Sequence, residues 1–170
     1  MGQSAFQTIA ASQGIAAVCY PPAVIKIGFL GGDILPVTSY SDEVFSEDAR
    51  FALRNMENVP HEILYEIQDR MWQAALECLA ARASEFATLQ DLCDSEAIIN
   101  GKLNGQIAPT GPANIMRAVQ LSEVQIVRST TPEGESRLMV GVFGECAWDA
   151  EFGVAVLFDA HGTLISAGGA

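Results

Sequence analysis

Residues 138–146 (LMVGVFGEC) and 154–158 (VAVLF) decide the fold of this 170-residue chain more than any other stretch. Both runs are rich in β-branched and aromatic residues, which suit a pleated, half-buried surface. Between them, residues 147–153 (AWDAEFG) combine a tryptophan, two carboxylates and a glycine. Two strand-like runs that flank a short turn predict an antiparallel β-hairpin.

Two further strand-like segments extend this hairpin. Residues 124–128 (VQIVR) alternate between apolar and polar side chains, and the turn-rich segment 130–136 connects them to the next strand. On the other side, the tight turn at 159–162 (DAHG) leads into residues 163–166 (TLIS). Since each connection is short, we expect four consecutive strands in an antiparallel meander.

The middle of the chain predicts helices. We expect one helix at about 46–57, because the Ser46 hydroxyl can cap exposed amides and acidic residues follow in the first turn. A second is expected at about 60–83, where apolar residues recur at steps of three and four. Residues 42–99 as a whole look helical, but the pattern weakens from Leu89 onward. Loop-forming Asn, Gly and Pro residues then follow.

Together these segments predict an α+β fold. An antiparallel C-terminal β-meander should carry the helices at about 46–57 and 60–83 packed on one face. A separate strand is expected at 24–30, between a Pro-Pro pair and a Gly-Gly-Asp turn. With 49% apolar residues, the chain can bury one core, so we expect a single domain over 1–170 with residues 1–22 irregular.

The charge balance limits the partners that the protein can have. Twenty-one Asp and Glu face nine Lys and Arg, which gives a formal net charge of -12. Nucleic acid is therefore not an expected partner, because phosphate binding relies on Lys and Arg. An acidic surface favours association with a basic partner instead. General solubility is the simpler explanation for the same charge.

One row of carboxylates stands out on the second predicted helix. These residues recur at helical spacing on the polar side of the helix: Glu62, Glu66, Asp69 and Glu77. Like charges at this spacing repel each other by a few tenths of a kcal/mol per pair. Two interpretations remain open, a solvated helix face and a surface shaped for a basic partner.

The absence of several sequence motifs indicates the cellular compartment and whether a cofactor is needed. The cysteines Cys19, Cys78, Cys93 and Cys146 lie too far apart for a CxxC metal or redox motif, so we interpret them as free thiols of a reducing cytosol. No run approaches the roughly 18 apolar residues of a membrane span. The N-terminus lacks the basic region of an export signal, since its first Lys is Lys26. We therefore expect a cytoplasmic protein without a cofactor.

No catalytic motif is recognisable. The sequence contains no GxSxG, HExxH, GxGxxG or Walker spacing. His61 and His161 have no nucleophile at motif spacing, and Asp149, Glu151 and His161 are too few for a structural zinc site. We thus predict a protein that is not an enzyme and binds no metal. The alternative is a small-molecule hydrolase or other enzyme with a site near the loop at 100–112 and the adjacent hairpin turn.

The segment FGECAWDAEFGVAV at 143–156 resembles a family of uncharacterised bacterial domains. Their C-terminal hairpin reads W-D-x-E-H-G before a short apolar strand, and members occur among candidate immunity proteins of polymorphic toxin systems. The resemblance covers residues 113–168, and Phe152 stands where His is usual. It implies a small cytosolic protein that neutralises a cognate toxin by binding it.

Our hypothesis from the sequence is therefore an immunity-type protein. It would bind a cognate protein toxin with a basic surface, and block that toxin without catalysis of its own. The candidate partner-binding residues are carboxylates on the second helix and in the hairpin turn: Glu62, Glu66, Asp69, Glu77, Asp149 and Glu151. A regulatory or scaffold domain, including a homodimer, is a further alternative.

Overall fold

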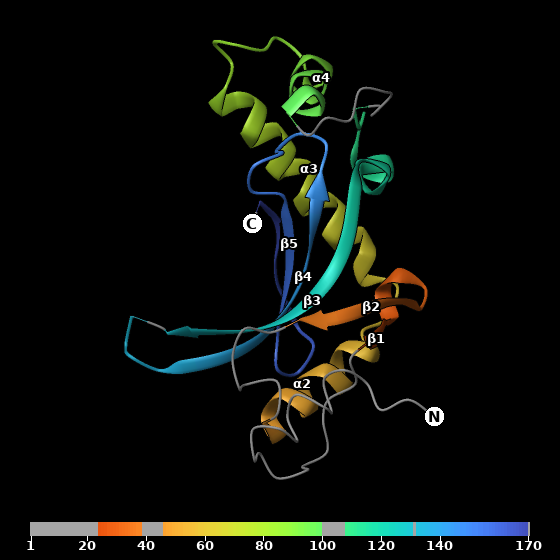
Figure 1. Ribbon diagram of the computed structural model, residues 1–170, viewed down its shortest axis with the longest axis vertical. Coiled ribbons are helices and arrows are strands. Elements are labelled where there is room, and N and C mark those ends of the chain that lie inside the picture. The colour runs from red at the N-terminus through yellow and green to blue at the C-terminus, as the bar shows by residue number, and fades with distance from the viewer. Residues whose placement is uncertain (1–23, 39–45, 100–107, 131, 170) are drawn as a thin grey trace, which may run out of the picture.

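The computed structural model describes residues 24–38, 46–99, 108–130 and 132–169. Within these ranges, six strands form one sheet in sequence order (Figure 1). The strands are β1 (Val24–Ile27), β2 (Asp33–Thr38), β3 (Val119–Thr130), β4 (Ser136–Cys146), β5 (Val154–Asp159) and β6 (Leu164–Gly169). Neighbouring strands are antiparallel except for β2 and β3, which are parallel. The predicted four-strand meander is β3 to β6.

Three α-helices lie in the described part of the chain: α2 (Glu47–Glu57), α3 (Ile63–Ala81) and α4 (Leu89–Ile99). Short 3-10 helices, η1 (Gly28–Leu30) and η3 (Pro112–Ala118), precede β2 and β3. With a mostly antiparallel sheet and separate helices, the fold is α+β, as predicted.

The start of α2 follows the predicted capping. The Ser46 hydroxyl accepts a hydrogen bond from the amide of Ala49 at 3.0 Å, and Glu47 and Asp48 occupy the first turn. The helix α3 starts later than the sequence suggested, at Ile63. Its amide bonds the Pro60 carbonyl at 3.3 Å in a turn that leads into the helix. The predicted start of α2 is therefore close to the observed one, whereas α3 was predicted to start about three residues too early.

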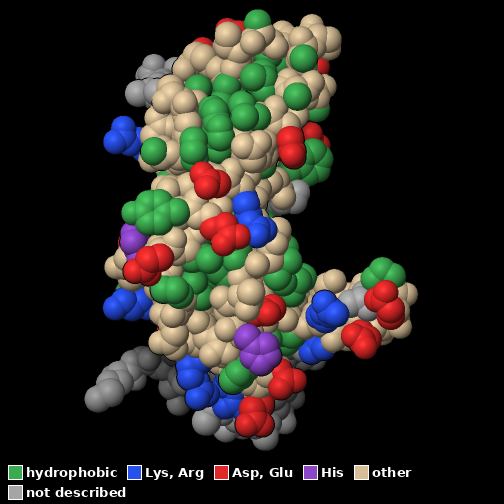
Figure 2. Space-filling model, turned by 180° about the vertical axis from the view of Figure 1, so that it is seen from behind, with side chains coloured by type: hydrophobic (Ala, Val, Ile, Leu, Met, Phe, Trp, Pro, Cys, Tyr) green, Lys and Arg blue, Asp and Glu red, His purple; other side chains and the backbone are tan. Residues whose placement is uncertain are grey.

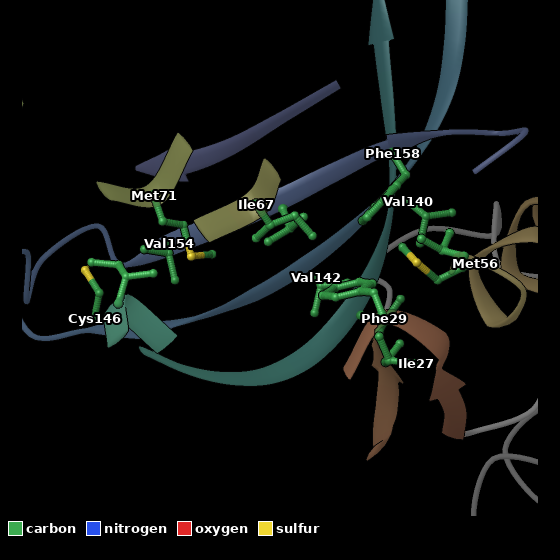
Figure 3. Close-up of a cluster of buried hydrophobic side chains, with 14 of the residues drawn as sticks. Ile27, Phe29, Met56, Ile67, Met71, Val140, Val142, Cys146, Val154 and Phe158 are labelled. Carbon is green, nitrogen blue, oxygen red and sulfur yellow. The ribbon is translucent and has the colours of Figure 1, made fainter. Parts of the chain in front are cut away.

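The core lies between the sheet and the helices α2 and α3. Alternate residues of the central strands are fully buried on one face, including Val140, Val142, Val156 and Phe158. Figure 3 shows Met56 of α2 beside Val140 and Met71 of α3 beside Val154. The ring of Phe29 packs against that of Phe158, with centroids 5.5 Å apart. Removal of these large side chains from water supplies the main stabilisation of the fold.

The N-terminal part differs from the sequence-based expectation. The strand predicted at 24–30 ends at Ile27, because the chain turns into η1 and then reverses through Gly31 and Gly32. Both glycines have positive φ, 70° and 96°, a conformation that glycine adopts at little cost. The reversal creates β2, which the sequence did not indicate.

The described residues contain no helix that is both long and apolar enough to cross a membrane. The irregular segment expected at 1–22 lies outside the described residues.

Candidate partner-binding site

One side of α3 faces solvent along its whole length. We call this surface the acidic face of α3; it comprises Glu62, Tyr65, Glu66, Asp69, Gln73, Leu76 and Glu77, all exposed. Figure 2 shows acidic side chains spread over this side of the molecule, with hydrophobic patches between them. From residue 62 to residue 77 the face is about 22 Å long, at 1.5 Å per residue. The structure thus places the four predicted α3 carboxylates on one continuous surface.

Few of the carboxylates on this face are neutralised by a neighbouring basic side chain. Arg70 forms an ion pair with Glu66 at 2.6 Å and donates a second hydrogen bond to the carbonyl of Ile165 in β6 at 2.7 Å. Glu62, Asp69 and Glu77 form no ion pair with any described residue. Tyr65, at 71% exposed, presents an aromatic ring in the same row. The combination is an anionic surface with an exposed aromatic side chain near its N-terminal end.

The opposite face of α3 explains why the helix holds this orientation. Ile67, Met71 and Ala75 are completely buried against the core. Because residues three and four apart share one side of a helix, the apolar stripe turns the carboxylate row outward. The sequence pattern therefore specifies both faces at once.

The other two predicted residues lie in the β4–β5 turn. The Asp149 carboxylate accepts a hydrogen bond from the amide of Phe152 at 3.0 Å, so it is engaged in its own turn. Glu151 is exposed. The turn reaches the C-terminal part of α3, where the Cys78 thiol donates to the Trp148 carbonyl at 3.5 Å. Cys78 is half-buried and lies on the side of α3 that carries the buried stripe, so this contact brings the turn to the C-terminal end of α3 and does not place Asp149 or Glu151 on the acidic face.

A buried carboxylate that sequence reasoning missed holds this turn in place. Glu96 of α4 is 4% exposed. Its two oxygens accept hydrogen bonds from the Arg82 guanidinium at 2.5 Å and from the amide of Ala150 at 2.7 Å. The bond with Glu96 also raises the pKa of Arg82 above its ordinary value. Since the three residues are far apart in sequence, only the folded chain reveals the link.

The thiols near the turn are protonated at neutral pH. Burial raises the pKa of Cys93 and of Cys146 to about 12, and burial together with the charge of Asp149 raises the pKa of Cys78. All three are free cysteines, as expected, while Cys19 lies outside the described residues. Protonated, buried thiols are poor nucleophiles and poor metal ligands. No group of His, Cys, Asp and Glu in the described ranges is arranged to hold a metal ion.

A hollow of about 350 Å³ lies between α3 and β6. Its lining comes from four helix residues and four strand residues: Arg70, Gln73, Ala74, Glu77, Ser166, Ala167, Gly168 and Gly169. The alternative site near the loop at 100–112 is not built by these residues, and its segment 100–107 lies outside the described part of the chain. The hollow depends on how β6 pairs and packs, so sequence spacing could not indicate it.

These features define an α+β protein with an exposed acidic helix face. A family model described as a domain of unknown function, DUF6985, matches residues 21–170, and the chain belongs to that family. Comparison with curated proteins gave no match, and neither did comparison with solved structures.

Proposed function

We propose that this protein is an immunity-type protein, which binds a cognate bacterial toxin through the acidic face of α3 and blocks it. The observation that carries the proposal is the exposed, largely unneutralised carboxylate row around Tyr65. An anionic surface on a chain of net charge -12 attracts a basic protein over long range and accelerates association.

The apolar members of the face support binding rather than simple solvation. Tyr65 is 71% exposed and Leu76 is 37% exposed, although both lie on a helix whose other side is well packed. Aromatic anchors surrounded by polar residues are typical of the residues that dominate protein interfaces. Charge would then guide the encounter, and the side chains of Tyr65 and Leu76 would hold the complex.

The sequence of the β4–β5 hairpin supports the proposal that the partner is a toxin. Its sequence, with Trp148, Asp149 and Glu151, resembles the C-terminal hairpin of candidate immunity proteins in toxin systems. Trp148 is 1% exposed and Asp149 caps the turn, so these two residues build the hairpin. Recognition of the toxin is accordingly assigned to the exposed residues of the acidic face of α3 and not to these two.

Isolation of the partner tests this proposal. Tagged protein is recovered from its native host, and bound proteins are identified by mass spectrometry. We expect one stoichiometric partner with a basic toxin domain, lost when Glu66 and Asp69 are both replaced by Lys. A charge-matched control, Glu57→Lys with Glu133→Lys, alters exposed residues elsewhere and should retain the partner. Equal recovery with both double variants would remove α3 from the interface.

A further inference from the structure

We propose that the outer edge of β6, together with the hollow beside it, binds an extended segment of the partner that carries Lys or Arg. This inference deepens the proposed function, because it names how part of the partner would dock. The segment would add a strand to the sheet and place a basic side chain in the hollow near Glu77. Main-chain hydrogen bonds give such complexes affinity, and side-chain pockets give them specificity.

The edge of the sheet is available at β6. This strand pairs with β5 on one side, and no strand pairs with its other side in the ranges that the structure describes. Figure 1 shows this end of the chain at the margin of the sheet, next to α3. An edge strand presents unpaired N–H and C=O groups, which can pair with an incoming chain.

The first half of β6 is closed to such pairing. The register shifts between Leu157 and Phe158, so Ile165 is an extra residue that bends the strand. Its carbonyl already accepts a hydrogen bond from Arg70 at 2.7 Å. Strand addition is therefore confined to the second half of the strand, Ser166 to Gly169.

The second half of β6 is both open and close to the helix. A Cβ on Gly168 would lie 2.9 Å from the Cβ of Ala74, so only glycine allows this approach to α3. A Cβ on Gly169 would have no atom within 4 Å, so space lies beside it. Small residues on both elements leave the hollow of about 350 Å³ at this point.

The charged residues that line the hollow favour a basic side chain in it. Among the described residues that line the hollow, Arg70 is the one cation, and it is already bonded to Glu66 and to Ile165. Glu77 has no ion pair with any described residue. A Lys or Arg side chain of the partner would pair with Glu77. A second copy of β6 (LISAGG) offers no cation and would bring another Glu77. Charge complementarity therefore favours a basic partner segment over self-pairing.

Amide chemical shifts of the full-length protein test this proposal. The probe is a capped peptide of alternating Val and Lys. We expect it to shift the amide signals of Ser166 to Gly169. A peptide of equal charge with Pro in place of Val, which cannot pair as a strand, should leave them unchanged. Equal shifts from both peptides, or shifts confined to other elements, would overturn the proposal.

Two variants sharpen the test. Gly169→Leu introduces a bulky side chain into the open space at this end of the strand and should weaken the peptide-induced shifts. Glu77→Gln should weaken peptide binding by about fivefold, while the matched Glu133→Gln, at an exposed carboxylate in the turn between β3 and β4, should leave it unchanged. Unaltered binding by Gly169→Leu, or a concentration-dependent dimer that already occupies β6, would contradict the proposal.

Failure here is distinguishable from failure of the proposed function. If Gly169→Leu still retains the toxin but the α3 double variant loses it, strand addition is wrong and the acidic face stands. If neither variant loses the toxin, both proposals fall.

Discussion

At the scale of single residues, Glu96 has the most consequential environment in the structure. It is buried, yet each carboxylate oxygen has a hydrogen-bond donor, one from Arg82 and one from the amide of Ala150. A buried charge is tolerable when it is paired and hydrogen-bonded in this way. Through these two bonds, Glu96 fixes the β4–β5 turn to α4 and to the end of α3.

Replacement of Glu96 by Ala should therefore lower stability. The amide of Ala150 would lose its acceptor inside the protein, at a cost of about 1–3 kcal/mol in the free energy of unfolding. Urea denaturation measures this loss. As a control, Glu85→Ala removes only an exposed partner of Arg82, 3.5 Å away, and should change stability by less than about 0.5 kcal/mol. Equal effects of the two variants would contradict the assigned role of Glu96.

The buried thiols make stability depend on pH on the alkaline side. The pKa of Cys93 and of Cys146 is about 12 in the folded state, against an ordinary value of 9.0. Between these values the unfolded chain binds fewer protons than the folded one, so stability is complete below pH 9 and falls as pH rises toward 12. Each thiol contributes a decline of at most about 1.4 kcal/mol per pH unit.

Urea unfolding of wild type and Cys93→Ala at pH 8, 9 and 10 tests this dependence. The variant starts from a lower stability, because it loses buried volume, but its decline with pH should be shallower than that of wild type. Parallel declines would show that Cys93 does not contribute.

At the scale of elements, the β4–β5 hairpin depends on one backbone conformation. Gly153 has φ of 70°, and a Cβ there would lie 2.4 Å from the Gly144 carbonyl oxygen. The reason for the glycine is thus both conformational and steric.

Gly153→Ala should destabilise the protein by about 1–3 kcal/mol, since alanine at this position is strained and collides with backbone. Gly169→Ala is the matched substitution, because a Cβ at Gly169 meets open space. It should change stability by no more than about 0.5 kcal/mol. Thermal unfolding of both variants compares them directly, and an equal loss would refute the steric account.

The elements also show what local sequence can and cannot predict. The capping serine and the acidic first turn located α2, and periodic apolar residues located α3, because burial on one helix face imposes a local pattern. The helix α4 was less evident, since its buried residues include Glu96, which resembles a surface residue in sequence. Short strands such as β2 carry too little pattern to be recognised alone.

At the scale of the whole molecule, the features that the sequence did not predict depend on contacts between distant segments. The parallel pairing of β2 with β3 joins segments more than eighty residues apart, Val37 with Val124. The hollow likewise needs β6 to lie against α3. The carboxylate row on α3 was predicted because it lies within one helix, whereas the contacts of the β4–β5 turn with Cys78 and Glu96 required the fold.

The central claim is that the acidic face of α3 neutralises a toxin. The most direct measurement is growth of sensitive cells that express the recovered toxin domain with wild type, with Glu66→Lys and Asp69→Lys together, or with the charge-matched control at Glu57 and Glu133. We expect wild type and control to restore growth and the α3 double variant to fail while remaining folded. Full protection by the folded α3 variant would contradict the account.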